Sequence, residues 1–233
     1  MNRTKFIEEI KKLGIEITDE QLNQLDSYFH LLVETNKKFN LTAITEEQDV
    51  YLKHFYDSLT IVKAIKLDNQ SLCDVGTGAG FPGLVLKIVF PNLNVTLIDS
   101  TNKKCLFLQE VITQLNLKNI QVINARIEEY SKVNREKFDI VTCRAVAPLK
   151  HLLEYSIPLV KVNGLFIPLK GNINNELENI DNYIKKLDIT QEQDTVFNLP
   201  VENSHRHILV FRKNNITNSL YPRRYSDIKK KEI

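Results

Sequence analysis

The sequence of 233 residues predicts an α/β fold, with a mostly parallel seven-stranded sheet, a terminal antiparallel hairpin and an N-terminal helical cap. Three observations support this prediction. The first 66 residues show helical periodicity without strand signals, short apolar runs alternate with helical stretches from Ser71 onward, and the last two runs have no helix between them. Apolar residues make up 42% and charged residues 26% of the chain, which excludes collagen-like and disordered proteins.

The predicted helical cap covers residues 1–66. Apolar residues recur at spacings of three and four over 22–33 and again over 50–62. Thr18 or Asp19 is a typical helix start, because short polar side chains there can accept a hydrogen bond from the first helical turn.

The predicted core covers residues 67–213 and carries the sheet. Its strand candidates are SLCDV at 71–75, NVTLID at 94–99, NIQVIN at 119–124, FDIVT at 138–142, GLFIPLK at 164–170, about 190–199, and 206–213. Helical runs separate the first five candidates, as βαβ units of a parallel sheet require. The last two follow a polar helix candidate at 172–188, and they predict an antiparallel hairpin at the end of the sheet.

The predicted tail, residues 214–233, is the only strongly basic segment. It holds Arg223, Arg224 and Lys229 to Lys231 against two acidic residues, whereas the whole chain has a formal net charge of only +2. Basic residues matter for nucleic-acid binding where they cluster, so the small net charge neither marks nor excludes that class.

Cysteine use and hydropathy predict a cytoplasmic protein. Cys73, Cys105 and Cys143 lie far apart, without the paired spacing of a zinc site or the density of a disulfide scaffold. The N-terminus lacks the apolar run of a secretory signal, and no stretch approaches the roughly 18 apolar residues of a membrane span. We therefore expect a soluble monomer without a metal or a membrane partner.

The segment DVGTGAGFPG at 74–83 predicts a ligand site at the end of the first strand. Gly76, Gly78 and Gly80 are three of only seven glycines in the chain, and they lie between a strand and an apolar helix. In this context glycines let the backbone approach a ligand. The alternative is a tight strand-to-helix turn that binds nothing.

Two adenosine cofactors compete for this loop. The dinucleotide pattern G-x-G-x-x-G fits at 78–83, but in that motif the first glycine follows the strand directly. The glycine that follows the strand here is Gly76, and counted from it the third glycine of the pattern is replaced by Phe81. Asp74 at the strand tip would repel a pyrophosphate and attract a cation. The loop therefore favours S-adenosylmethionine, which carries an ammonium and a sulfonium but no phosphate, over NAD.

Later strand ends complete the predicted pocket. Asp99 ends the next strand, where a carboxylate can accept ribose hydroxyls from either cofactor. Ile127 and Glu128 offer backbone groups and a carboxylate to an adenine amino group, or they form a solvated acidic loop. Arg144 ends the fourth strand and faces the crevice where a substrate must lie, unless a structural ion pair buries it.

Two signatures of base methylation are missing after the fourth strand. Enzymes that methylate an exocyclic amine usually carry Asn/Asp-Pro-Pro-aromatic there, and this chain reads CRAVAP at 143–148. Attack on a pyrimidine carbon needs a thiolate next to proline, and Cys143 is followed by Arg144 instead. A ring nitrogen, an oxygen, a protein or a small molecule remain as methyl acceptors.

The chain resembles the RsmG (GidB) family of bacterial ribosomal RNA methyltransferases from about Phe39 to Lys213. The matching segments are FNLTAI at 39–44, HFYDSL at 54–59, DVGTGAGFPGL at 74–84, DSTNKKCLFLQEV at 99–111, FDIVTCRAVAPL at 138–149 and PLVKVNGLFIPLKG at 158–171. The resemblance implies a Rossmann-like methyltransferase fold that uses S-adenosylmethionine. It also implies methylation of N7 of one guanine in small-subunit (16S) ribosomal RNA, near the decoding site, with that RNA or the small ribosomal subunit as partner.

By matching position, the resemblance implies cofactor contacts at Gly76, Phe81, Ile127, Glu128 and Arg144. The family often has alanine where this chain has Ile127, which alters the pocket wall but leaves a backbone contact intact. The predicted cofactor site thus comprises these positions together with Asp74, Gly78, Gly80 and Asp99.

Substrate contacts are expected in the cap and in the tail. Asn40, His54 and Asp57 lie in the segments most like the family, and a structural hydrogen bond between cap and core is the alternative for them. Arg223 and Arg224 belong to the matching YPRR, although the following YSDIKKKEI departs from the family.

The implied reaction needs no general base, because guanine N7 has a free lone pair and loses no proton on methylation. Arg144 is then expected to orient base or cofactor rather than to transfer a proton. The alternatives are a methyltransferase of another substrate, a non-catalytic RNA-binding module, and an NAD-dependent oxidoreductase.

Overall fold

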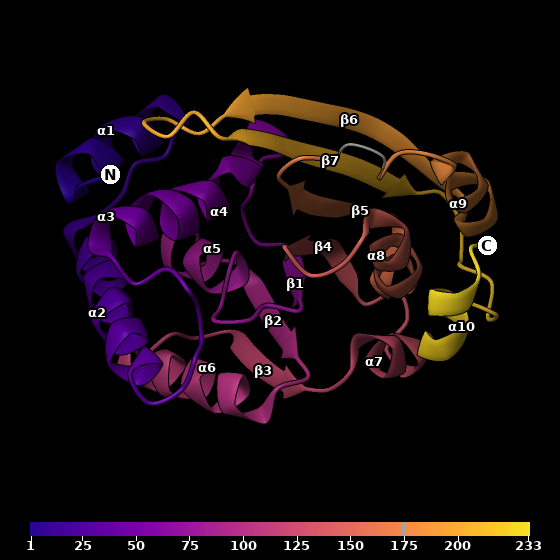
Figure 1. Ribbon diagram of the computed structural model, residues 1–233, viewed down its shortest axis with the longest axis horizontal. Helices are drawn as coiled ribbons and strands as arrows, with labels where there is room; N and C mark the ends of the chain where they lie inside the picture. Colours follow the sequence, from indigo (N-terminus) through magenta and orange to yellow (C-terminus); the bar gives the residue numbers. More distant parts are fainter. Residues whose placement is uncertain (174–175) are drawn as a thin grey trace.

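A computed structural model describes residues 1–173 and 176–233 (Figure 1). Its seven-stranded sheet has the order β3-β2-β1-β4-β5-β7-β6. The strands are β1 Ser71–Val75, β2 Asn94–Asp99, β3 Ile120–Asn124, β4 Phe138–Arg144, β5 Val160–Lys170, β6 Ile189–Asn198 and β7 His205–Lys213. Strands β1 to β5 pair in parallel, and β7 pairs antiparallel with both β5 and β6. The predicted α/β fold with a terminal hairpin is confirmed.

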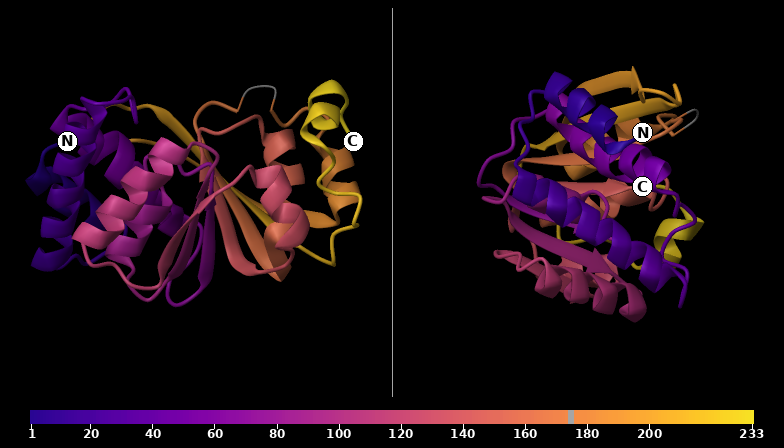
Figure 2. Two further views of the ribbon diagram at one scale, coloured as in Figure 1. Left: turned by 90° about the horizontal axis from the view of Figure 1, so that it is seen from below. Right: turned by 90° about the vertical axis from the view of Figure 1, so that its left-hand side faces the viewer.

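Helices cover both faces of the sheet (Figure 2). On one face lie α1 Arg3–Lys12, α2 Asp19–Asn36, α3 Glu47–Asp49, the π-helical turn η1 Val50–Tyr56, α4 Asp57–Leu59, the 3-10 turn η2 Thr60–Lys63, α5 Gly83–Val89 and α6 Asn102–Gln114. On the other lie α7 Ile127–Val133, α8 Leu149–Ser156, the 3-10 turn η3 Ile157–Leu159, α9 Ile180–Leu187 and α10 Tyr225–Lys230. No helix in residues 1–173 or 176–233 is long and apolar enough to cross a membrane.

The N-terminal helices pack against α5, α6 and the glycine loop. Tyr28 of α2 is fully buried, with its ring centroid 5.6 Å from that of Phe55 and 5.6 Å from that of Phe81. Its hydroxyl donates to the carbonyl of Ala79 in the loop. Cap and sheet therefore share one apolar cluster, and the division into cap, core and tail stays a prediction.

Two predicted helix boundaries had different outcomes. Thr18 caps α2 through its hydroxyl, which accepts from the backbone N–H of Gln21, so the predicted start is confirmed. The predicted helix 172–188 is wrong in length, because α9 begins only after Asn179, whose φ of +56° cannot continue a right-handed helix. Residues 174–175 of that prediction lie outside the described residues.

Candidate active site

Two cavities meet at the end of β4. The glycine-loop cavity has a volume of about 290 Å³ and is lined by residues that include Gly76, Asp99 and Glu128. The arginine cavity has a volume of about 470 Å³ and is lined, among the described residues, by Lys53, His54, Asp57, Arg144, Lys170 and Arg206, with others. Ala145 lines both, so a group bound in one cavity would lie beside a group bound in the other.

The three glycines of the loop have different environments. Gly76 and Gly78 have φ of +64° and +62°, and a Cβ added to Gly78 would meet nothing closer than the Gly76 carbonyl at 4.0 Å. A Cβ on Gly80 would instead lie 2.6 Å from the hydroxyl of Tyr28 and 3.0 Å from Leu108. Gly80, predicted to contact a cofactor, is therefore needed for packing between loop and cap. A Cβ on Gly76, which lines the cavity, would lie 2.7 Å from the side chain of Val146, so of the three only Gly78 faces open space.

Asp74, predicted to contact a cationic cofactor at the strand tip, lies behind the glycine loop. It is fully buried, and its Oδ2 accepts from the Thr77 hydroxyl at 2.6 Å and from the Gly83 N–H at 2.8 Å. Burial raises the pKa of Asp74 to about 6. Its Oδ1 has no hydrogen-bond partner within the described part of the chain. Asp74 thus shapes the loop from behind, and its charge still favours a cationic ligand in front of it.

The rest of the glycine-loop cavity agrees with the predicted adenosine site. Asp99 accepts the Gly78 N–H at 3.0 Å and the Thr101 N–H at 2.8 Å through different oxygens. Each carboxylate oxygen has a second lone pair, so both remain able to accept ribose hydroxyls. Ile127 and Glu128 line the cavity and open α7, where backbone N–H groups lack intrahelical acceptors.

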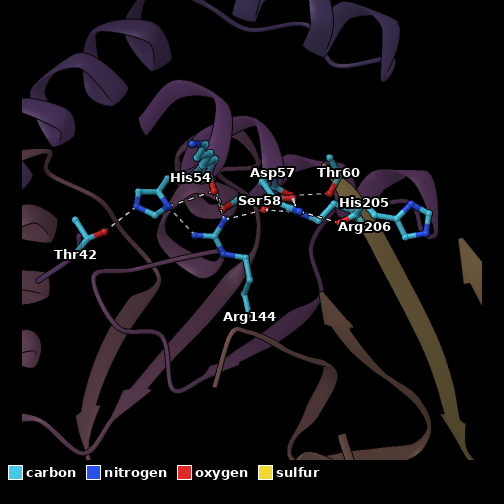
Figure 3. A network of polar contacts seen from close by, with 9 residues as sticks. Thr42, His54, Asp57, Ser58, Thr60, Arg144, His205 and Arg206 are labelled. Carbon is cyan, nitrogen blue, oxygen red and sulfur yellow. Dashed lines mark hydrogen bonds and ion pairs between the residues drawn. The ribbon is translucent and has the colours of Figure 1, made fainter. Parts of the chain in front are cut away.

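Arg144 is held at the boundary of the two cavities by side chains of the cap (Figure 3). One terminal nitrogen, Nη1, donates to the Lys53 carbonyl and, at 3.2 Å, to Oδ2 of Asp57. The guanidinium carbon lies 5.3 Å from the ring centroid of Phe81, and that ring stacks on His54 with centroids 4.2 Å apart. Phe81, predicted as a cofactor contact, thus supports Arg144 and His54 with its side chain.

His54 links Arg144 to the loop between α2 and α3. Its Nδ1 lies 3.0 Å from Nη2 of Arg144 and its Nε2 lies 3.0 Å from the hydroxyl of Thr42. Nδ1 also lies 3.2 Å from the Lys53 carbonyl, which can only accept, but the guanidinium, which can only donate, is nearer. We therefore assign Nδ1 as acceptor and place the imidazole proton on Nε2. Burial, together with the charge of Arg144, lowers the pKa of His54 to about 3. His54 is therefore neutral near pH 7, and its basic nitrogen is already occupied.

Asp57 joins three distant segments. Besides Arg144 it accepts from Nε of Arg206 on β7, which lies 3.1 Å from each carboxylate oxygen. For Asp57 the structure thus shows the cap-to-core bond that was the alternative to substrate contact. Asn40, the third predicted cap residue, is exposed, and Thr42 rather than Asn40 reaches His54.

Sequence reasoning missed Arg206. A topological signal could have found it: β7 runs antiparallel to β5, with His207 opposite Lys170. The start of β7 therefore lies at the same edge of the sheet as the ends of β4 and β5.

In the tail, Arg223 has a structural role, and its predicted contact with the substrate stays a prediction. Its Nε and Nη2 donate to the two carboxylate oxygens of Glu154 at 2.8 Å each, and its backbone N–H donates to the same carboxylate at 2.9 Å. Glu154 is fully buried in α8, so this pair fixes the tail to that helix. Arg224 is exposed and stays a candidate for RNA contact.

Comparison with known proteins decides the family. The profile of the family rRNA small subunit methyltransferase G matches residues 21–209. The chain belongs to this family. It is 46% identical over 231 residues to the ribosomal RNA small subunit methyltransferase G of Ligilactobacillus salivarius, with 96% of each chain covered. It is 48% identical over 231 residues to the protein of that name from Levilactobacillus brevis, again with 96% of each chain covered.

Solved structures share the fold at low sequence identity. A SAM-dependent methyltransferase from Aquifex aeolicus has a TM-score of 0.52 and 18% identity, over 76% of this chain and 97% of that one. TYW2 of M. jannaschii in complex with AdoMet has a TM-score of 0.52 and 18% identity, over 64% of this chain and 71% of that one. The predicted Rossmann-like methyltransferase fold is confirmed, and membership in this methyltransferase family confirms S-adenosylmethionine over NAD as cofactor.

Proposed function

We propose that the protein transfers the methyl group of S-adenosylmethionine to N7 of one guanine in small-subunit (16S) ribosomal RNA. The observation that supports this best is the pair of cavities that share Ala145, one built from glycines and carboxylates and the other from cationic side chains. The names of the relatives specify small-subunit ribosomal RNA as their substrate. The choice of guanine N7 follows from the sequence resemblance and from the state of His54.

Gly76, Asp99, Ile127 and Glu128 are the residues proposed to hold the cofactor, because they line one cavity and supply the carboxylates and backbone groups that an adenosine needs. S-adenosylmethionine supplies an electrophilic methyl group when it is bound. Asp74, buried behind the loop, contributes a negative charge that matches the net positive charge of this cofactor.

The arginine cavity is proposed to hold the guanine. Since N7 has its own lone pair, the residues here need only align the base and exclude water. His54 is unsuited to take a proton near pH 7, as its Nδ1 lone pair faces Arg144 and its pKa lies near 3. Arg144, fixed by Asp57 and His54, orients the base or the cofactor. These features favour a nucleophile that needs no deprotonation.

Mapping the methylated nucleotides of 16S RNA from bacterial cells with and without this protein tests the proposal. We expect one N7-methylguanine to disappear with the protein and to return when the purified protein and S-adenosylmethionine are added. Parallel reactions on naked RNA and on assembled small subunits identify the true partner in the cytoplasm. A methyl group on an exocyclic amine or a ribose oxygen would contradict the proposal, and the absence of turnover would favour the binding module.

A further inference from the structure

In the wall of the arginine cavity two guanidinium groups share one carboxylate, which leaves a local excess of one positive charge at that pair. Among the residues that the structure describes, Asp57 is the one carboxylate that contacts the guanidinium groups of both Arg144 and Arg206. The side chains of Arg144 and Arg206 are only 13% and 21% exposed, so water screens this excess poorly. Burial lowers the pKa of Arg144, the charges of Asp57 and Asp74 oppose this shift, and the charge of Arg206 adds to it.

Other cationic side chains around this cavity have acidic partners of their own. Lys170 lies 2.7 Å from Glu176, and Lys53 lies 3.3 Å from Asp49 and 3.4 Å from Glu202. Nδ1 of His207, also in the lining, lies 3.0 Å from a carboxylate oxygen of Asp194, and this imidazole adds a positive charge only when it is protonated. Lys170 thus has one carboxylate and Lys53 has two, whereas Arg144 and Arg206 share one, so the local excess of positive charge is at the two arginines.

The two arginines differ in how firmly they are held. Arg144 donates to three partners in the cap, Lys53, His54 and Asp57. Arg206 comes from the opposite side, on β7, and donates through Nε to Asp57 and through Nη1 to the His205 carbonyl (Figure 3). Arg206 is also the more exposed of the two. It is therefore the better placed to meet an anion that enters from solvent.

We propose that Arg206 binds a phosphate group of the RNA, next to the nucleotide that occupies the arginine cavity. This inference rests on the proposed function and assigns Arg206 to the substrate, with Asp57 as the residue that positions it. Asp57 orients the guanidinium from behind, and a phosphate in front supplies the second negative charge that the pair of arginines lacks. Arginine suits this contact because its planar group bonds a carboxylate on one edge and a phosphate on another.

The test measures binding of a 16S RNA transcript to the full-length protein at several salt concentrations, with S-adenosylhomocysteine present. Each phosphate contact adds about 0.7 to 0.9 to the slope of log affinity against log salt. Arg206→Gln should lower the slope by about that amount and weaken binding about tenfold. Arg206→Lys, which keeps the charge, should retain most of the slope.

Arg212→Gln is the matched control, because Arg212 lies on the same strand and pairs with Glu192 at the surface, away from the cavity. It removes the same charge and should leave the slope unchanged. An unchanged slope in Arg206→Gln, or an equal fall in Arg212→Gln, would overturn the inference.

A second measurement needs no variant. Inhibition of methyl transfer by 5′-GMP and by guanosine is compared in the wild-type protein, and we expect 5′-GMP to inhibit at an about tenfold lower concentration. Equal inhibition would overturn the inference even if Arg206→Gln failed to fold. Mapping the methylated atom in the same wild-type reactions tests the proposed function separately. The salt dependence of RNA binding is the same whichever atom is methylated, so the two proposals can fail independently.

Discussion

Alanine substitutions in the glycine loop should separate packing from ligand binding. In Gly78→Ala the new Cβ meets only the Gly76 carbonyl at 4.0 Å, so the loss is the cost of an L-residue at φ +62°, about 1 kcal/mol. In Gly80→Ala the φ is +110°, and the Cβ lies 2.6 Å from the hydroxyl of Tyr28. Backbone strain and overpacking together should then lower the free energy of unfolding by about 3 to 5 kcal/mol.

Calorimetric melting of the ligand-free variants measures this difference. For a chain of this size the melting temperature should fall by about 3 °C in Gly78→Ala and by about 10 °C in Gly80→Ala. Tyr28→Phe removes the hydroxyl oxygen, the atom nearest the new methyl group of Gly80→Ala. The substitution Tyr28→Phe should therefore lower the stability of Gly80→Ala by less than it lowers the stability of the wild-type protein. Titration with S-adenosylmethionine should show that Gly78→Ala binds the cofactor more weakly than the wild-type protein does. This loss of affinity should exceed what the small loss of stability would cause. Equal melting temperatures in the two alanine variants would refute the division of roles.

Further predictions concern the histidine, the buried tail pair and the basic tail. Single-turnover methyl transfer should vary little between about pH 6.5 and 9, and a log-linear rise that disappears in His54→Gln would make His54 a base. The pKa of His54 falls from 6.5 to about 3 on folding, so between these pH values the unfolded state binds one more proton than the folded state. As the pH is lowered from about 6.5, the free energy of unfolding of the wild-type protein should therefore decrease more steeply than that of His54→Gln, which urea unfolding would measure. Arg223→Ala removes the charged partner of buried Glu154, which keeps only the backbone N–H of residue 223, and should lower the free energy of unfolding by about 3 to 5 kcal/mol; a loss below about 1 kcal/mol would contradict that role. Neutralising Arg224 and Lys229 to Lys231 together should lower the salt dependence of RNA binding if the tail contacts phosphate, and an unchanged slope would show that the tail is only solvated.

Local patterns were enough to predict the fold. The alternation of strands and helices and the glycine loop act within a few residues, so the chain displays them directly. They also placed Asp99, Ile127 and Glu128 correctly at one cavity.

The contacts that were missed join residues far apart in sequence. Arg206 and Asp57, 149 residues apart, meet only because β7 runs back beside β5. Glu154 and Arg223, 69 residues apart, gave no local sign of pairing, and Arg223 was therefore expected at the RNA. Asp74 and Gly80 were expected at the ligand because the sequence does not show which side of the loop the cap covers.

The carboxylate of Asp57 also bears on the order in which the protein folds. It connects a cap residue to a strand end 87 residues later and to the last strand 149 residues later. Contacts that close such long loops cost more chain entropy than those between sequential βαβ units, so they form late on average. The pair of arginines is thus expected to assemble after β1, β2 and β3, which pair with neighbours in the chain, have begun to shape the glycine-loop cavity. Partly folded chains would then acquire the capacity to bind a nucleoside before the capacity to bind RNA.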